Sequence, residues 1–332
     1  MGGSMVGFED IRNVALVGAG TMGAGISVCF AQAGYEVTLY SRSAEGIQRA
    51  LGRVRHSQEV FIQEELISRQ DAEAARARIQ GTTSLEKGLQ GAHFVLESIP
   101  EDLALKQRVF REMEPLCCAD AILATNTSGL SITAIASVCK RPERVGGMHW
   151  VNPAEIVPLV EVVRGEKTAD GAVDVICKVA EKLGKVPVVV RKDVPGFASN
   201  RLQAAVFREA LHLVEAGIVT PEDVDKILKN GVGFRYPWLG PLETADLGGL
   251  EVFHAICVNL FGELSTMTEP PAFFSDMVQS GNLGIKSGQG FYDYAGKSRE
   301  DILRRRDLYF IRQAKLIREI METKPLGRKD TK

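Results

Sequence analysis

The chain has 332 residues, 45% of them hydrophobic and 25% charged, which is the composition of a globular protein and excludes disordered and fibrous classes. This length is enough for two domains with separate cores. The formal net charge of −2 gives no global electrostatic reason to bind nucleic acid or an anionic membrane, so we expect a small-molecule partner and neither of these.

The cysteines and the hydropathy of the chain indicate the cellular compartment in which we expect the protein. The six cysteines show no CxxC spacing, and two of them, Cys117 and Cys118, are adjacent. This pattern suits neither a disulfide framework nor a zinc site, so we expect no metal and a reducing, cytoplasmic setting. We also expect no signal peptide and no transmembrane helix, because no apolar run approaches the ~18 to 20 residues that span a bilayer.

Up to about Asp193 the chain alternates short β-branched runs with amphipathic stretches of helical length. This alternation predicts a Rossmann-type α/β domain with a doubly wound, mostly parallel sheet. The long charged segment over residues 44–80 exceeds one crossover helix and is expected to project as a helical hairpin. The predicted strands cover residues 14–17, 36–40, 94–98, 122–125, 144–148, 159–163 and 187–190.

A break at Asp193-Val-Pro-Gly196 ends this pattern, because proline and glycine interrupt regular structure. We therefore predict a Rossmann domain over residues 1–193 and an all-α domain over residues 194–332. The basic residues of the last helix are expected to solvate an exposed face, with an anion site as the alternative. The predicted helices of this second domain cover residues 197–216, 221–228, 250–261, 271–280 and 301–321.

The first predicted strand runs directly into the sequence GAGTMG, which is followed by a helix. A G-x-G-x-x-G turn in this context is typical of dinucleotide binding. Its first glycine makes the tight turn, the second lets the backbone approach the pyrophosphate, and the third lets the helix pack on the strand. The free amides of the helix N-terminus favour phosphate. The predicted cofactor contacts in this turn are Gly18, Gly20, Thr21, Met22 and Gly23.

The end of the second predicted strand bears on the choice of cofactor. It reads Ser41-Arg42-Ser43, so it lacks the acidic side chain that usually binds the ribose hydroxyls of NAD. A guanidinium between hydroxyls suits a 2′-phosphate. We therefore expect NADP(H), with Ser41 and Arg42 as contacts. The alternative is NAD(H), with Arg42 stacked on the adenine.

Polar residues follow the later strands, where ligands bind in open α/β sheets. Ser128, His149 and Glu161 lie in or just after predicted strands, and Asn200 follows the predicted domain boundary. Taken one at a time, each also has a structural interpretation: a helix cap, a buried histidine, a surface charge and a helix-start residue. These residues alone therefore do not choose a reaction.

Seven stretches between Val14 and Tyr294, in the same order, resemble the 3-hydroxyacyl-CoA dehydrogenase family: GAGTMG, ATNTSGLSIT, GMHWVNP, PLVEVV, KDVPGFASNRL, GPLETADLGGL and KSGQGFYDY. Several unrelated motifs in one order are far more specific than any one of them. The resemblance implies an oxidoreductase that interconverts a 3-hydroxyacyl-CoA and a 3-oxoacyl-CoA with a nicotinamide cofactor. It also implies a homodimer formed through the helical domain.

The resemblance assigns roles to individual residues. It implies that His149 is the general base for the hydroxyl proton, and that Glu161 orients the imidazole and stabilises its charged form. Ser128 and Asn200 are implied to hold the substrate oxygen where negative charge gathers. Further cofactor contacts are implied at Glu101, Lys106, Asn152 and Lys286. For the first two of these, a solvated helix charge is the alternative.

Two departures from the acyl-CoA pattern bear on the substrate. The segment 44–80 lacks the lysines that usually lie near the CoA phosphates, with arginines as candidate substitutes. Arg235 lies in GFRYPWLGP, which resembles relatives that act on free hydroxy acids, such as lambda-crystallin (L-gulonate dehydrogenase) and carnitine dehydrogenase. Arg235 is therefore a candidate for binding a substrate carboxylate, with an inter-domain salt bridge as the alternative.

Three functions stay open on the sequence. We favour the acyl-CoA substrate because the late stretch KSGQGFYDY is kept, and the free 3-hydroxy acid is the alternative. A non-catalytic, crystallin-like nucleotide-binding protein is the third. The complete set of Ser128, His149, Glu161 and Asn200 argues against it.

Overall fold

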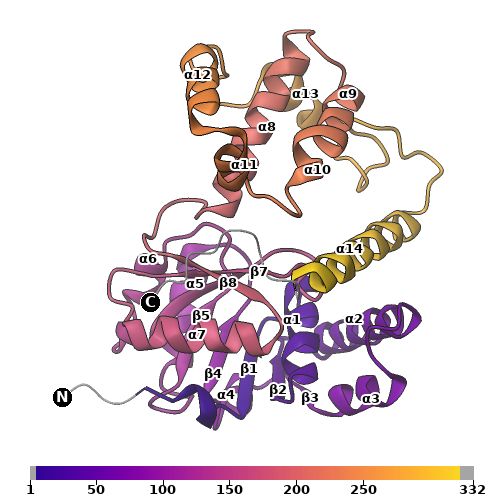
Figure 1. Cartoon of the computed structure of the whole chain (residues 1–332). Coiled ribbons are helices and arrows are strands. Elements are labelled where there is room, and N and C mark those ends of the chain that lie inside the picture. Colours follow the sequence, from indigo (N-terminus) through magenta and orange to yellow (C-terminus); the bar gives the residue numbers. More distant parts are fainter. Residues whose placement is uncertain (1–4, 322–332) are drawn as a thin grey trace. The chain divides into compact units, whose positions relative to one another are not determined.

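The computed structural model describes residues 5–321, and the chain divides into two units, Met1–Asn200 and Arg201–Lys332. The first unit contains one eight-stranded sheet of order β3-β2-β1-β4-β5-β6-β7-β8 (Figure 1). Its strand order reverses beside β1, which is the doubly wound Rossmann arrangement that the sequence predicts. The strands are β1 (Asn13–Val17), β2 (Glu36–Tyr40), β3 (Ile79–Thr82), β4 (Phe94–Glu97), β5 (Ile122–Thr125), β6 (Val145–Trp150), β7 (Leu159–Val163) and β8 (Val186–Val190).

Neighbouring strands are parallel except for β6 and β7, which pair antiparallel. In this pair His149 on β6 lies directly opposite Glu161 on β7. Opposed residues of antiparallel strands have their side chains on the same face and within contact distance. The register of β6 and β7 therefore brings these two side chains together.

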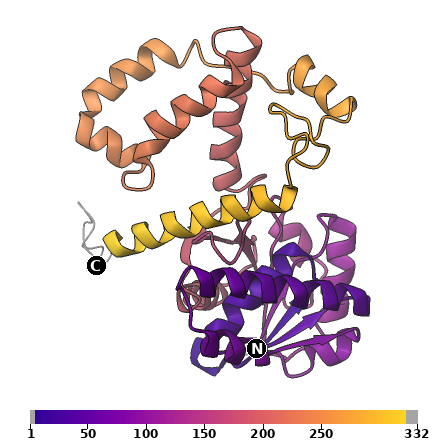
Figure 2. The same cartoon turned by 90° about the vertical axis from the view of Figure 1, so that its right-hand side faces the viewer.

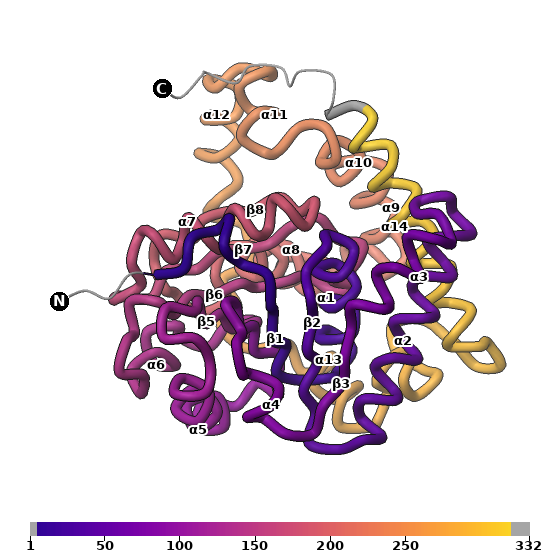
Figure 3. The backbone as a smooth tube through the Cα atoms, turned by 90° about the horizontal axis from the view of Figure 1, so that it is seen from below, coloured from indigo at the N-terminus to yellow at the C-terminus, as the bar shows by residue number. Residues whose placement is uncertain are grey.

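Helices α2 and α3 pack on each other and form the helical hairpin predicted for residues 44–80 (Figure 3). The sequence prediction missed β3, because only one of its four residues is buried and it lacks the apolar run of a central strand. The helices of this unit are α1 (Thr21–Gln32), α2 (Ala44–Gln63), α3 (Arg69–Ala77), α4 (Leu85–Leu89), α5 (Leu103–Met113), α6 (Ile132–Ala136) and α7 (Asp170–Lys182).

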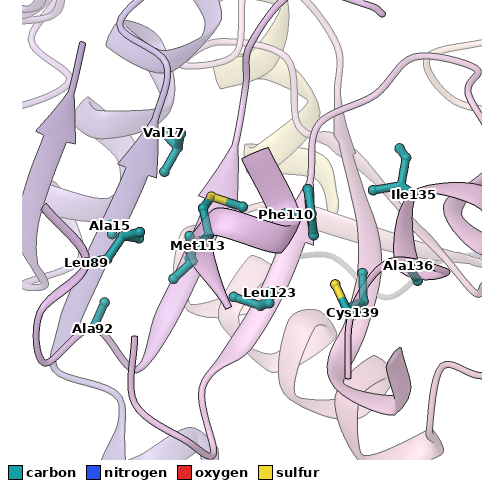
Figure 4. Close-up of a cluster of buried hydrophobic side chains, with 12 residues drawn as sticks. Ala15, Val17, Leu89, Ala92, Phe110, Met113, Leu123, Ile135, Ala136 and Cys139 are labelled. Atoms are coloured by element: carbon teal, nitrogen blue, oxygen red, sulfur yellow. The ribbon is translucent and has the colours of Figure 1, made fainter. Parts of the chain in front are cut away.

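A hydrophobic core holds the central strands against helices α4, α5 and α6 (Figure 4). Every residue of β4 and β5 is buried, as expected for parallel strands that are covered on both faces. Phe110 and Met113 of α5 belong to the same buried cluster as Val17 of β1 and Leu123 of β5. This packing fixes the carboxyl ends of the strands from which the polar residues of the site follow.

The second unit is helical, as predicted (Figure 2). Helix α8 (Ser199–Glu215) begins at the end of the first unit, and Thr220 caps α9 by accepting a hydrogen bond from the Asp223 amide. The sequence prediction missed α11, which lies between Gly-Pro and Gly-Gly pairs. The remaining helices are α9 (Pro221–Ile227), a π-helical turn (Leu228–Val232), α10 (Gly233–Arg235), α11 (Pro241–Gly248), α12 (Leu250–Leu260), α13 (Ala272–Gln279) and α14 (Arg299–Met321).

Candidate active site

The glycine-rich turn after β1 has the geometry that a pyrophosphate requires. Gly18 adopts a φ of +121°, and a Cβ there would clash with the backbone that follows β4. A Cβ on Gly23 would clash with the Gly18 carbonyl, whereas a Cβ on Gly20 would meet no atom within 4 Å. The space at Gly20 is thus open to a ligand, and the amides of Thr21 and Met22 in the first turn of α1 lack intrahelical acceptors. The turn fits a dinucleotide.

The end of β2 presents Ser41 and the exposed Arg42. Ser43 accepts a hydrogen bond from the Gly46 amide at 3.0 Å and so caps α2. The hydroxyl of Ser41 packs against Gly46, where a Cβ would collide with it. One of the two hydroxyls beside Arg42 therefore has a structural role, which the sequence analysis did not foresee.

His149 and Glu161 form a buried pair. Nδ1 of His149 lies 2.8 Å from Oε2 of Glu161, and the two residues are 5% and 1% exposed. The ring of Phe197 packs edge-on against the imidazole, with centroids 5.7 Å apart. Because an ionised carboxylate can only accept, Nδ1 carries a proton, and in the neutral imidazole Nε2 then has a free lone pair. Nε2 has no hydrogen-bond partner among the described residues, so this atom is the one that can take a proton from a substrate.

Four donors converge on the Glu161 carboxylate. Oε1 accepts hydrogen bonds from the amides of Ala198 (3.0 Å) and Ser199 (2.8 Å), and Oε2 accepts from the Ser199 hydroxyl (2.6 Å) as well as from His149. Burial alone would raise the pKa of Glu161, but the hydrogen bonds from His149, Ser199 and Ala198 together outweigh it and lower the pKa to about 2. Glu161 is therefore ionised at neutral pH.

A second carboxylate, Glu101, holds the turn that carries the exposed Ser128. Its Oε1 accepts hydrogen bonds from the Thr127 hydroxyl (2.6 Å) and from the amides of Ser128 (2.8 Å) and Gly129 (3.2 Å). Burial opposes ionisation of Glu101, but these bonds and the nearby Lys106 ammonium lower its pKa overall. The structure thus gives Glu101 a role in shaping the site, while its predicted contact with a cofactor stays a prediction.

The four predicted catalytic residues take part in two sets of hydrogen bonds that meet at the neighbouring residues Ser199 and Asn200. The side-chain amide of Asn200 donates a hydrogen bond to the Ser128 carbonyl oxygen at 2.8 Å. The residue before it, Ser199, bonds to Glu161, which in turn bonds to His149. The sequence analysis assigned no role to Ser199, although its position inside KDVPGFASNRL next to Asn200 was an available signal.

Lys106 lies beneath the turn rather than at its surface. Its fully buried ammonium is 2.6 Å from Glu97 Oε1 and 3.5 Å from Glu101 Oε2, and the Thr125 hydroxyl donates to the other oxygen of Glu97 at 2.6 Å. Sequence reasoning missed Glu97, although a carboxylate that ends an apolar strand was a signal for it. We expect Lys106 to act on the site through Glu101, and its direct contact with a cofactor stays a prediction.

The other predicted residues occupy exposed positions. Asn152 follows β6 in the first unit, whereas Arg235 at the end of α10 and Lys286 after α13 belong to the second unit. Within the described part of the second unit, Arg235 forms no ion pair. Binding of a carboxylate by Arg235, and of a cofactor by Asn152 and Lys286, stays a prediction.

Two family models match the chain: the NAD binding domain of 3-hydroxyacyl-CoA dehydrogenase over residues 13–194, and its C-terminal domain over residues 196–294. The chain belongs to the 3-hydroxyacyl-CoA dehydrogenase family. It is a nicotinamide-dependent dehydrogenase of that family, as its motifs predict.

Members of this family with different substrates match the chain about equally well in sequence. It is 35% identical over 284 residues to 5-formyl-3-hydroxy-2-methylpyridine 4-carboxylate 5-dehydrogenase of Mesorhizobium japonicum, covering 86% of this chain and 91% of that protein. It is 36% identical over 282 residues to 3-hydroxybutyryl-CoA dehydrogenase of Clostridioides difficile, covering 85% and 99%.

Solved structures of family members show the same fold. A crystal structure of 5-formyl-3-hydroxy-2-methylpyridine 4-carboxylic acid 5-dehydrogenase, named an NAD+ dependent dismutase, matches with a TM-score of 0.87 at 32% identity and covers 93% of this chain and 99% of that chain. The (S)-3-hydroxybutyryl-CoA dehydrogenase of Ralstonia eutropha matches with a TM-score of 0.72 at 34% identity and covers 86% and 100%.

None of the helices over residues 5–321 is both long and apolar enough to cross a membrane. The same residues contain no group of three or more His, Cys, Asp or Glu side chains placed to hold a metal ion.

Proposed function

We propose that this enzyme interconverts the 3-hydroxyl and 3-oxo groups of an acyl-CoA thioester by hydride transfer. The observation that carries the proposal is the buried His149–Glu161 pair, which connects through the adjacent residues Ser199 and Asn200 to the Ser128 turn. The names of relatives that are 3-hydroxybutyryl-CoA dehydrogenases support the thioester substrate.

The geometry supports a general-base mechanism in the direction of oxidation. Nε2 of His149 takes the hydroxyl proton, while Nδ1 keeps its proton on Glu161. The imidazolium that forms is stabilised by the adjacent carboxylate. The Ser128 hydroxyl and the second amide hydrogen of Asn200 hold the substrate oxygen as negative charge develops on it. When bound, the nicotinamide ring supplies the hydride acceptor for this direction and the donor for the reverse.

We propose NAD(H) as the cofactor. The match to a structure named NAD+ dependent supports it. The exposed Arg42 at the end of β2 favours NADP(H), which is the second candidate. Titration with NADH and NADPH separates them. At least tenfold tighter binding of NADPH, lost in Arg42→Ala, would overturn the proposal.

A free 3-hydroxy or 3-oxo acid is the second candidate substrate. Arg235 is exposed and has no carboxylate partner within the described part of its unit, so its guanidinium is available for a substrate carboxylate. The structure that matches with a TM-score of 0.87 belongs to a dehydrogenase of a pyridine carboxylate. These two observations favour the free acid, and the names of the acyl-CoA relatives favour the thioester.

The decisive experiment compares turnover of acetoacetyl-CoA with that of small free 3-oxo acids, followed by loss of NADH absorbance. Fast turnover of the thioester supports the proposal, and Arg235→Ala should then behave like the matched surface variant Arg299→Ala. Turnover of a free acid alone, lost in Arg235→Ala but kept in Arg299→Ala, would replace the thioester by the carboxylate. His149→Gln should abolish turnover and leave the affinity for NADH unchanged. Retained turnover in that variant would overturn the mechanism.

We further propose that the enzyme is a homodimer and acts in the cytoplasm. Large apolar side chains on α8, α11 and α12 are exposed in the single chain, including Leu202 at 68%, Leu242 at 81% and Val258 at 69%. A second copy of the chain would remove this surface from water. Sedimentation at twice the chain mass of 36.2 kDa is the expected result. All six cysteines are free thiols, which supports the reducing compartment.

A further inference from the structure

Ser199 contributes two of the four donors at Glu161. Its amide lies 2.8 Å from Oε1 and its hydroxyl 2.6 Å from Oε2, so one residue at the start of α8 holds both carboxylate oxygens. The amide is part of the backbone and would be present with any residue here. The hydroxyl is specific to this side chain, and it approaches the same oxygen as His149 Nδ1.

We infer that Ser199 is a positioning residue of the active site. Its hydroxyl fixes the plane of the Glu161 carboxylate and weakens the stabilisation that this carboxylate gives to the protonated His149 imidazole. This inference deepens the proposed function and rests on it, because it concerns how the base is prepared. The hydroxyl hydrogen brings the positive end of its dipole to Oε2. That positive end stabilises the ionised carboxylate and disfavours an imidazolium bound to the same oxygen.

The surroundings leave few other charges to set this balance. His149 and Glu161 are the only titratable side chains on β6 and β7, and the neighbouring strands β5 and β8 carry none. Glu97 on β4, two strands away from β6, is held by Lys106. Asp193 in the linker before α8 is bonded to α6 through Ser131.

The helices against β6 add no charge at this point. The residues that α6 and α7 bury are all apolar, and the Arg164–Asp170 and Lys178–Asp174 ion pairs lie at partly or largely exposed side chains. Among the described residues, the Ser199 hydroxyl is the one side-chain donor to Glu161 other than His149.

The experiment is a pH titration of the full-length protein labelled with 15N-histidine, in which His149 is identified by the signal that disappears in His149→Gln. The chain has five histidines, so its signals are countable. In Ser199→Ala, the midpoint of the His149 titration is expected to rise by about half a pH unit, about a threefold change in the protonation equilibrium. Ser199→Thr, which keeps a hydroxyl, should restore the wild-type midpoint.

Two further variants keep the test decisive. Ser68→Ala removes the serine that caps α3 and should leave the midpoint unchanged. Ser199→Cys keeps nearly the native volume with a weaker donor and should shift the midpoint in the same direction. It takes the place of Ser199→Ala in the test if that variant does not fold. A midpoint unchanged in every folded Ser199 variant that lacks the hydroxyl overturns the inference.

Turnover provides the second readout. Ser199→Ala should lower kcat about tenfold, as expected for a lost hydrogen bond to a charged group, with KM changed less than twofold. The titration does not depend on turnover. A shifted midpoint in a protein that turns over no hydroxyacyl or oxoacyl substrate would support the role of Ser199 and overturn the proposed function instead.

Discussion

Replacing Glu161 by glutamine is a direct test of the base, because it removes the charge and one acceptor oxygen while keeping the volume. In the structure, two backbone amides point at Oε1, and a hydroxyl and an imidazole N–H point at Oε2. The backbone amides cannot turn away. The glutamine oxygen must therefore face them, which places its NH2 group against the Ser199 hydroxyl and Nδ1 of His149.

This orientation puts the His149 proton on the wrong atom. Nδ1 must now accept a hydrogen bond, so the neutral imidazole carries its proton on Nε2 and cannot take one from the substrate. The corresponding tautomer change in a serine protease triad lowers kcat about 10⁴-fold. We expect Glu161→Gln to lower kcat by about 10³ to 10⁴, or about 4 to 5 kcal/mol in the activation barrier.

The assay measures kcat for acetoacetyl-CoA by loss of NADH absorbance, together with the 15N shifts of His149, which report the tautomer. Glu73→Gln on the exposed face of α3 is the matched control and should keep wild-type kcat. If Glu161→Gln kept more than a tenth of the wild-type kcat, or if Nδ1 stayed protonated in it, the assignment of Nε2 as the base would be refuted.

Three more outcomes follow from the structure. Gly20→Ala should fold normally but weaken NADH binding at least tenfold by isothermal titration calorimetry, because its Cβ enters open space at the pyrophosphate position. Gly23→Ala should in addition lower the melting temperature, because its Cβ clashes with the turn. Lys106→Met leaves Glu97 buried without its cation and should lower the free energy of unfolding in urea by about 3 to 5 kcal/mol. The double variant with Glu97→Gln should regain part of this stability, because it removes the unpaired buried charge. The pKa of Glu161 falls from its ordinary 4.5 to about 2 on folding. Ionised Glu161 therefore contributes about 3 kcal/mol to the free energy of unfolding above about pH 4.5, and this contribution is lost toward pH 2. In Glu161→Gln, the unfolding free energy should lack this part of the acid-induced decrease.

Much of the fold could be predicted from the sequence because short stretches of residues determine its elements. The apolar run of β1 followed by GAGTMG determines a strand, a tight turn and a helix within twenty residues, and in the structure Gly18 and Gly23 occupy positions where a Cβ would clash, while the space at Gly20 is open. The alternation of strands and helices up to residue 190 determines a parallel sheet. Edge strand β3 and helix α11 escaped prediction, because neither carries a strong apolar period.

The contacts within the site could not be predicted from such local patterns, because they depend on which strands become neighbours. His149 faces Glu161 only because β7 runs antiparallel to β6 in one register, and a shift of one residue would turn Glu161 to the other face. The role of Ser199 depends on the start of α8 meeting β7, and that of Glu97 on a lysine from α5 lying beneath the sheet end. The sequence by itself determined the nucleotide turn and the chemical types of the site residues. Only the tertiary structure decided which donor faces which oxygen, since a hydrogen bond is specified by distance and direction in space rather than by separation along the chain.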